Sequence, residues 1–352
     1  MEECIISERD GQILYNRYFH QDQKNVCRAL ESYYDYGSIA ALFPSGMCAI
    51  DSLFQVLMIK NKWDGINIVY GSELYCDTPR TIKYLSSNYI QANLHKINVM
   101  KDDDILKLFE KDLNHKYPTI LFIEACSNPN GKVFNFKLLP RLKELATRLK
   151  VIVDNTWLTS VIFNPFRFEE VDFVVNSLTK YYGADRSGIL GVVLARNKEM
   201  GEMILDYGKV KGLHVSPLYC AEAYRNILKV KERILRTSEI TMNVAQYLSD
   251  KGYKVNYPRL MSNPSSERYR EFFGSLGPSV FTITLKMKRD QALIWMRSSE
   301  KFRCVTSFGA ADSRFDQWPS RQGNTTTCRF SVGFEDTAEN IKKEFDHLLA
   351  KI

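Results

Sequence analysis

The sequence predicts an α/β protein, with a large, mostly parallel sheet covered by helices on both faces and a smaller C-terminal α+β domain. Between about residues 40 and 200, short apolar runs alternate with helical patterns, which is typical of a parallel sheet. Several runs are apolar throughout, as in strands buried on both faces. The chain has 352 residues, enough for more than one domain.

The elements of the first domain follow from apolar periodicity. The expected strands are 40–43, 67–70, 91–99, 119–125, 151–153, 171–175 and 188–195. The expected helices are 23–34, 47–60, 78–85, 102–113 and 138–149. Residues 1–38 are expected to form an N-terminal arm and the first helix, and residues 39–225 the large domain.

The second domain is expected over residues 226–352. A long mixed-charge helix over 219–248 connects the domains and ends before Gly252, which suits a C-terminal cap. Strands are expected at 280–287, 303–308 and 326–332, and a closing amphipathic helix at 338–349. The segment 261–277 is rich in Ser, Pro and Arg and is expected to be a mobile loop.

Composition argues against several classes of protein. The formal charge is +7, but Lys and Arg are spread along the chain, which argues against a nucleic-acid partner. The eight cysteines include no C-x-x-C pair, which argues against a zinc ribbon. The N-terminus lacks the apolar core of a signal peptide, and no run approaches a membrane span. We therefore expect a cytoplasmic protein without a membrane partner.

Polar residues follow two of the expected buried strands. The run Val151–Val153 ends at Asp154, and the run Val171–Val175 leads through Ser177 to Lys180. Because chemistry collects at the carboxyl ends of strands in open α/β sheets, both side chains are expected at one edge. An acid and a lysine together suit pyridoxal 5'-phosphate (PLP): the lysine holds the aldehyde as a Schiff base, and the acid keeps the pyridine nitrogen protonated.

A strand, a glycine turn and a helix follow one another at residues 40–60. The turn Pro44-Ser45-Gly46-Met47 precedes the expected helix, whose N-terminal N–H groups and dipole favour an anion. A Ser-Gly turn alone is a weak signal, so an ordinary turn stays open at this point.

Three motifs identify a family. V-I-V-D-N-T-W-L-T at 151–159, N-S-L-T-K-Y at 176–181 and R-F-S-V-G-F-E-D at 329–336 resemble the Cys/Met metabolism PLP-dependent enzymes. That family includes cystathionine γ-synthase, the cystathionine lyases and methionine γ-lyase. The resemblance runs from about residue 13 to the C-terminus. It implies the PLP-dependent transferase fold of type I, a PLP cofactor, and a homo-oligomer with active sites shared within a dimer, expected to form a tetramer.

The resemblance implies a role for each matching residue. Lys180 would form the Schiff base and then move protons between substrate carbons, Asp154 would pair with the pyridine nitrogen, and Asn128 would lie near the phenolic oxygen. Tyr75 would stack on the ring and act as an acid or base. The phosphate would be held by Ser45, Gly46, Met47, Ser177 and Thr179, and by Tyr15 and Arg17 of a neighbouring subunit. The substrate would be bound by Arg329 through its α-carboxylate, by Ser307 and by Asp312.

The chain departs from the family pattern mainly near the expected substrate pocket. Residues 314–321, R-F-D-Q-W-P-S-R, replace a small, hydroxyl-rich segment ending in histidine, and Gly183-Ala184-Asp185-Arg186 replaces Gly-His-x-Asp. The expected activity is β- or γ-elimination, or γ-replacement, on a sulfur-containing or O-acylated amino acid. An aminotransferase or decarboxylase on the same fold, and a catalytically idle structural relative, stay open as alternatives.

Overall fold

The computed structural model describes residues 8–9, 12–13, 20–61, 65–87, 92–184 and 188–352. The chain divides into two compact units. The larger comprises Met1–Asn128 with Val133–Leu228, and the smaller comprises Pro129–Lys132 with Lys229–Ile352. Among the described residues, no helix is both long enough and apolar enough to cross a membrane.

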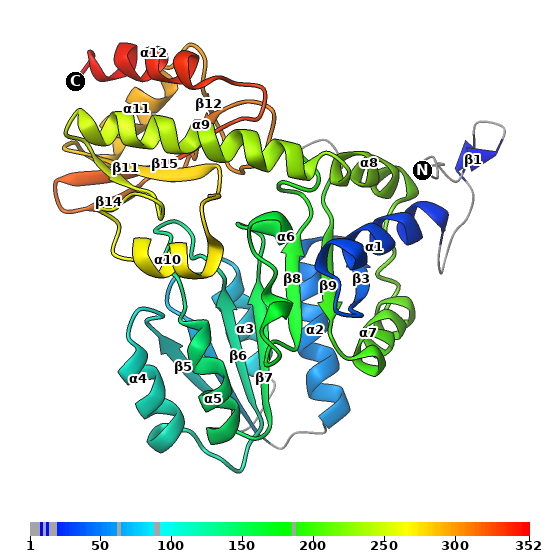
Figure 1. The fold of residues 1–352 in the computed structure, drawn as a ribbon. Helices are drawn as coiled ribbons and strands as arrows, with labels where there is room; N and C mark the ends of the chain where they lie inside the picture. The colour runs from blue at the N-terminus through cyan, green and yellow to red at the C-terminus, as the bar shows by residue number, and fades with distance from the viewer. Residues whose placement is uncertain (1–7, 10–11, 14–19, 62–64, 88–91, 185–187) are drawn as a thin grey trace. The chain divides into compact units, whose positions relative to one another are not determined.

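The larger unit is built on a seven-stranded sheet (Figure 1) with the order β3-β9-β8-β7-β6-β4-β5. Its strands are β3 (Ile39–Phe43), β4 (Ile66–Gly71), β5 (Ala92–Ile97), β6 (Thr119–Glu124), β7 (Leu149–Asp154), β8 (Phe173–Ser177) and β9 (Gly191–Ala195). Strands β5, β4, β6, β7 and β8 are joined in parallel, and β9 runs antiparallel to both β8 and β3. A short pair, β1 (Glu8–Arg9) and β2 (Gln12–Ile13), lies outside this sheet.

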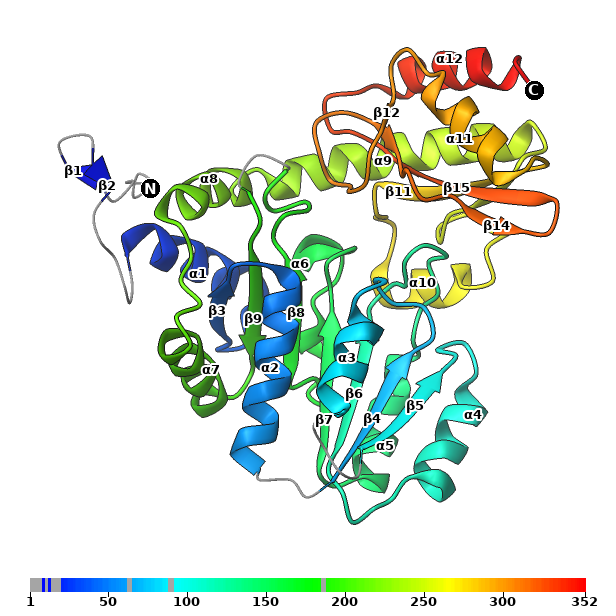
Figure 2. The same cartoon turned by 180° about the vertical axis from the view of Figure 1, so that it is seen from behind.

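Helices cover both faces of this sheet. They are α1 (Gln21–Tyr34), α2 (Gly46–Asn61), α3 (Thr78–Ser86), α4 (Asp102–Lys107), η1 (Leu108–Asp112), η2 (Phe136–Leu138), α5 (Leu139–Leu145), α6 (Thr159–Ile162), η3 (Pro165–Arg167), α7 (Lys198–Val210) and α8 (Pro217–Ile227). Helix α5 lies before the sheet in Figure 1 and α2 behind it, and Figure 2 reverses this order. Apolar side chains of α2 pack on one face of the sheet, against Phe43, Ile68 and Phe122 among others.

The apolar sequences of β4, β6 and β9 explain why these strands are buried in the large sheet. Every residue of β4, β6 and β9 is buried, as expected for strands covered on both faces. In a parallel sheet the carboxyl ends of all strands meet at one edge, and the loops after β4, β6, β7 and β8 therefore emerge there. The predicted α/β class and largely parallel sheet are confirmed.

The smaller unit has a mostly antiparallel sheet with the order β10-β11-β15-β13-β12, and β14 pairs with β15. Its strands are β10 (Lys254–Asn256), β11 (Val280–Leu285), β12 (Arg303–Cys304), β13 (Arg314–Phe315), β14 (Ser320–Gln322) and β15 (Thr325–Ser331). Its helices are α9 (Val230–Asp250), α10 (Ser266–Phe273), α11 (Arg289–Arg297) and α12 (Ala338–Leu349). Its core contains Phe281, Phe315, Phe330 and Phe345, whose rings pack at centroid distances of 4.9–6.3 Å.

Several expected elements differ from the structure, among them the following four. The helix over 138–149 ends at Leu145, because Ala146 leaves the helical conformation and Leu149 begins β7. The helix over 219–248 is interrupted at Leu228–Lys229 and forms α8 and α9. The strand over 303–308 is only two residues long, Arg303–Cys304. The expected loop 261–277 contains α10, which buries Tyr269, Phe272 and Phe273.

Candidate active site

Asp154 and Lys180 lie at the same edge of the large sheet. Asp154 is the last residue of β7 and is aligned with Val175 of β8, which ends two residues later at Ser177. Lys180 follows in a tight turn, in which its carbonyl oxygen accepts hydrogen bonds from the N–H groups of Gly183 (3.1 Å) and Ala184 (2.7 Å). The turn therefore holds the lysine just beyond the strand end, as the sequence predicts.

The buried carboxyl group of Glu124 lies beside the half-buried Asp154. Glu124 ends the neighbouring strand β6 and is directly aligned with Asp154. Burial raises the pKa of Asp154, although hydrogen bonds from Thr156 lower it. Burial and the charge of Asp154 raise the pKa of Glu124 well above its usual range. The buried Glu124 carboxyl group and the half-buried Asp154 beside it favour a cationic partner, such as a protonated ring nitrogen.

The turn before α2 forms a compact cradle at the helix N-terminus. The Ser45 hydroxyl oxygen accepts a hydrogen bond from the N–H of Cys48 (3.0 Å), and Gly46 begins the helix. A Cβ atom on Gly46 would lie 3.0 Å from the Cβ of Ser177, and one on Gly191 would lie 2.2 Å from the Ser45 carbonyl oxygen. Glycine at these two positions lets Ser177 and β9 pack closely against the turn, and the N-terminus of α2 offers the N–H groups and the dipole that favour an anion. Met47 follows and is half-buried.

The polar residues after β8 make different contacts. The Ser177 N–H donates to the Thr156 hydroxyl (2.9 Å), and the Ser177 side chain adjoins Gly46. The Thr179 hydroxyl contacts the backbone of Leu190, with which it shares hydrogen bonds of 3.3 and 3.4 Å. Ser177 therefore lies against the glycine turn, whereas Thr179 stabilises the connection between β8 and β9.

Tyr75 and Asn128 lie in the loops that follow β4 and β6. The Tyr75 side chain is half-exposed, and burial of its other part raises the pKa of the phenol above its usual value. The N–H groups of both residues donate to the carboxyl group of Glu124. The two loops are thereby joined at the edge that carries Asp154.

The expected substrate residues belong to the smaller unit. Arg329 lies in β15 and forms an ion pair with Asp316. Asp312 forms an ion pair with Arg314 (2.5 Å), whose side chain is buried. Ser307 has a φ of 111°, in the region that favours glycine, which marks a strained backbone. Tyr15 and Arg17 lie outside the described residues, as do Asp185 and Arg186.

Three residues of this arrangement are absent from the sequence-based prediction. The sequence pattern places Glu124 in the apolar run of β6 and Gly191 in the apolar run of β9. It places Asp316 in the divergent segment 314–321. A polar residue ending a buried strand, the signal that marks Asp154, also marks Glu124. Gly191 and Asp316 depend on contacts between segments distant in sequence, which the sequence pattern does not show.

The groups of the larger unit fit PLP. The cradle at Gly46 suits a phosphate, the Lys180 amine suits an aldehyde, and Asp154 suits a basic ring nitrogen. The evidence for the cradle is the close approach of Ser177 and Gly191 to the turn, which only glycine permits.

Known proteins resemble the chain over most of its length. The family model for Cys/Met metabolism PLP-dependent enzymes matches residues 2–350. The chain is 24% identical over 309 residues to the cystathionine beta-lyase of Neurospora crassa, covering 84% of this chain but 65% of that protein. It is 25% identical over 356 residues to the cystathionine gamma-lyase of Saccharomyces cerevisiae, covering 95% of this chain and 87% of that protein.

A solved structure shares the fold. It is a putative O-acetylhomoserine (thiol)-lyase from Campylobacter jejuni that contains N'-pyridoxyl-lysine-5'-monophosphate. The TM-score is 0.79 at 18% identity, with 95% of this chain and 87% of that chain covered. Because the family model spans nearly the whole chain, the protein belongs to the Cys/Met metabolism PLP-dependent enzymes, with pyridoxal 5'-phosphate as its cofactor.

Proposed function

We propose that this enzyme catalyses β- or γ-elimination, or γ-replacement, on a sulfur-containing or O-acylated amino acid. The observation that carries the proposal is the common sheet edge at which Asp154 and Lys180 lie. The similarity of the chain to a cystathionine beta-lyase and to a cystathionine gamma-lyase supports it. When bound, PLP supplies an electron sink that eases removal of protons from the substrate carbons.

The residues of the larger unit have distinct tasks. Lys180 binds the cofactor aldehyde and then carries protons between substrate carbons. Asp154 would hold the proton of the pyridine nitrogen, a task that its position beside the buried Glu124 favours, because a cation there offsets the two adjacent carboxyl groups. Tyr75 would pack against the ring and exchange protons with the substrate, and Asn128 would bind the phenolic oxygen.

The phosphate is held by the cradle at the start of α2. Ser45, Gly46 and Met47 supply backbone N–H groups and Ser177 supplies a hydroxyl group. Thr179 supplies a second hydroxyl group by donating to the phosphate in place of the Leu190 carbonyl oxygen. The helix dipole favours the negative charge at this place. We propose that Tyr15 and Arg17 of a neighbouring subunit also bind the phosphate. The active enzyme is then a homo-oligomer, which we propose to be a tetramer.

The smaller unit is proposed to bind the substrate. Arg329 takes the α-carboxylate, because a guanidinium offers two parallel N–H donors to a carboxylate. Ser307 supports the same group through its backbone, and Asp312 helps to shape the pocket. In this proposal residues 39–225 form the cofactor domain and residues 226–352 the substrate domain, and the enzyme is cytoplasmic.

The test combines absorbance with product analysis. Purified protein with PLP is expected to absorb visible light, and Lys180→Ala is expected to lose that band and all turnover. L-cystathionine, O-acetylhomoserine and L-methionine are then supplied with and without a thiol. Loss of the γ- or β-substituent supports the proposal. A keto acid with its side chain intact indicates transamination, and turnover of none of these amino acids contradicts the proposed function.

A further inference from the structure

Glu124 has an unusual position for a carboxyl group. It ends β6, which lies between β4 and β7 in the large sheet, and only 7% of its surface is exposed. The next strand places Asp154 directly beside it. A carboxyl group here costs stability, because it is desolvated next to another acid. A carboxyl group in such an unfavourable position calls for an explanation other than packing.

The two oxygen atoms of Glu124 bind two different loops. Oε1 accepts a hydrogen bond from the Tyr75 N–H (2.5 Å), and Oε2 accepts one from the Asn128 N–H (3.0 Å). Tyr75 follows β4, and Asn128 follows β6 itself. One carboxyl group thus joins the backbones of both loops at the edge of the sheet where Asp154 and Lys180 lie.

A second hydrogen bond joins the same two loops, and here the loop after β6 supplies the donor and the loop after β4 supplies the acceptor. The Ser127 hydroxyl donates to Oε2 of Glu73 at 2.9 Å. Each side therefore supplies a carboxylate to the other: Glu124 accepts from the Tyr75 N–H in the loop after β4, and Glu73 accepts from the Ser127 hydroxyl in the loop after β6. This reciprocal arrangement restricts where the Tyr75 ring and the Asn128 amide can lie.

We propose that Glu124 is a positioning residue, whose carboxyl group fixes the backbones of Tyr75 and Asn128 and so places their side chains for the reaction. The proposal rests on the proposed function, because that function gives Tyr75 and Asn128 their roles. Glu124 acts through them and touches neither reactant. Fixed loops lower the cost of ordering these side chains when cofactor and substrate bind.

The central test is Glu124→Gln in the PLP-loaded enzyme. Glutamine has the same shape, but only its amide oxygen can accept a hydrogen bond, so one of the two N–H groups loses its partner. We expect hydrogen exchange at Tyr75 or Asn128 to become about tenfold faster or more, in line with the loss of a hydrogen bond worth about 1.5 kcal/mol. We also expect kcat to fall at least about tenfold, while the melting temperature of the cofactor-free protein is unchanged or rises because the Glu124 charge beside Asp154 is gone.

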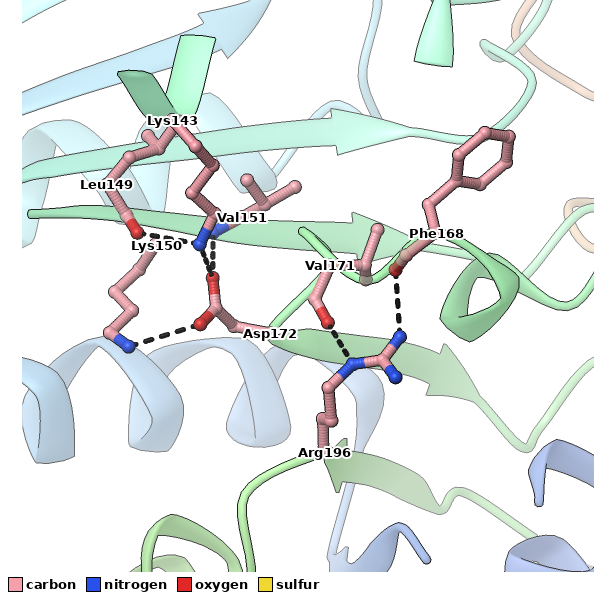
Figure 3. A network of polar contacts seen from close by, with 8 residues as sticks. All are labelled: Lys143, Leu149, Lys150, Val151, Phe168, Val171, Asp172 and Arg196. Atoms are coloured by element: carbon pink, nitrogen blue, oxygen red, sulfur yellow. Dashed lines mark hydrogen bonds and ion pairs between the residues drawn. The ribbon is translucent and has the colours of Figure 1, made fainter. Parts of the chain in front are cut away.

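A matched control lies at the opposite end of the same sheet. Asp172 accepts a hydrogen bond from the Val151 N–H (2.8 Å) and forms ion pairs with Lys143 and Lys150 (Figure 3). Asp172→Asn is expected to lower the melting temperature while leaving exchange at Tyr75 and Asn128 unchanged. Should that variant fail to fold, Lys150→Ala removes a single ion pair and serves the same purpose.

A double-mutant comparison separates positioning from a general loss of structure. If Glu124 acts mainly through Tyr75, Glu124→Gln in a Tyr75→Phe background is expected to reduce kcat by much less than about tenfold. A fall in melting temperature with unchanged exchange at both amides overturns the proposal, as does faster exchange with unchanged kcat. Failure of the proposed function is recognised separately, since Lys180→Ala and Tyr75→Phe would then leave turnover unchanged.

Discussion

Arg329 and Asp316 form an ion pair within the smaller unit, with 13% and 11% of their side chains exposed. Asp316 follows β13, which is paired with β15, and its N–H donates to the Arg329 carbonyl oxygen at 2.9 Å. The guanidinium that the family resemblance assigns to the substrate carboxylate therefore already contacts a carboxylate of the protein. A substrate must share this guanidinium or displace Asp316.

Asp316→Asn tests whether the two carboxylates compete. Asparagine keeps the shape but removes the charge, so Arg329 binds it less strongly. We expect the KM of the amino-acid substrate to fall by about three- to tenfold, which corresponds to about 1 kcal/mol, with kcat nearly unchanged. Steady-state kinetics measure this. A KM that rises would show that Asp316 orients Arg329 for the substrate and does not compete with it.

Arg329→Ala is expected to impair both stability and substrate binding. It leaves the nearly buried Asp316 without its cation, a change that costs about 3–5 kcal/mol in comparable pairs. Thermal unfolding is expected to show this loss, and the double variant Arg329→Ala with Asp316→Ala is expected to recover most of it. KM is expected to stay high in both variants. If the double variant also recovers KM, Arg329 does not bind the substrate carboxylate.

Gly191→Ala is expected to damage the phosphate cradle. Its Cβ would lie 2.2 Å from the Ser45 carbonyl oxygen and 2.5 Å from the Gly46 nitrogen, both backbone atoms that cannot move without opening the turn. We expect at least about a tenfold loss of PLP affinity and about 1–3 kcal/mol of stability. Equilibrium titration with PLP and thermal unfolding measure the two effects.

Gly208→Ala is the matched control in the same unit. Gly208 lies in α7, where an added Cβ would be 3.5 Å from the Phe43 ring, an ordinary contact. Alanine within a helix is favoured over glycine by about 0.5–1 kcal/mol, so this variant is expected to be as stable as the wild type or more stable. Equal losses of PLP affinity in both variants would contradict the explanation by steric exclusion.

The sequence predicted the parts of the site that depend on local pattern. Asp154 and Lys180 follow short apolar runs, and a parallel sheet brings such positions to one edge whatever the details of packing. Glu124 has the same kind of position, but its two backbone partners belong to loops whose approach is tertiary. The pairing of Asp316 with Arg329 likewise requires the alignment of β13 with β15, which no short sequence motif reports.

The same distinction holds for the fold. Strands β4 and β6 were predicted within one residue at each end, because their apolar runs are bounded by turn residues, whereas β9 begins at Gly191 and not at Gly188. The interruption at Leu228–Lys229 was not predicted from the sequence. Neither glycine nor proline marks it, and tertiary packing decides where α8 ends. Helix α10 was missed because its buried aromatic residues lie within a segment whose composition is typical of a loop.

The pH dependence of stability is expected to reveal the paired carboxyl groups. Folding raises the pKa of both Asp154 and Glu124 above the unfolded values of about 4. Their contribution to stability is therefore fully present below about pH 4 and is lost as pH rises through the folded pKa values. In cofactor-free protein, Asp154→Asn removes one charge and its repulsion of the other.

Thermal unfolding of cofactor-free Asp154→Asn and wild type between pH 5 and pH 7.5 measures this effect. The melting temperature of the variant is expected to rise relative to that of the wild type as pH increases, by about 2–4 °C for each kcal/mol of relieved repulsion. With PLP bound, the wild type is expected to have the higher melting temperature. Its Asp154 carboxylate then pairs with the protonated ring nitrogen, and the asparagine does not. A difference that stays constant with pH in the cofactor-free protein would show that Asp154 and Glu124 do not repel each other.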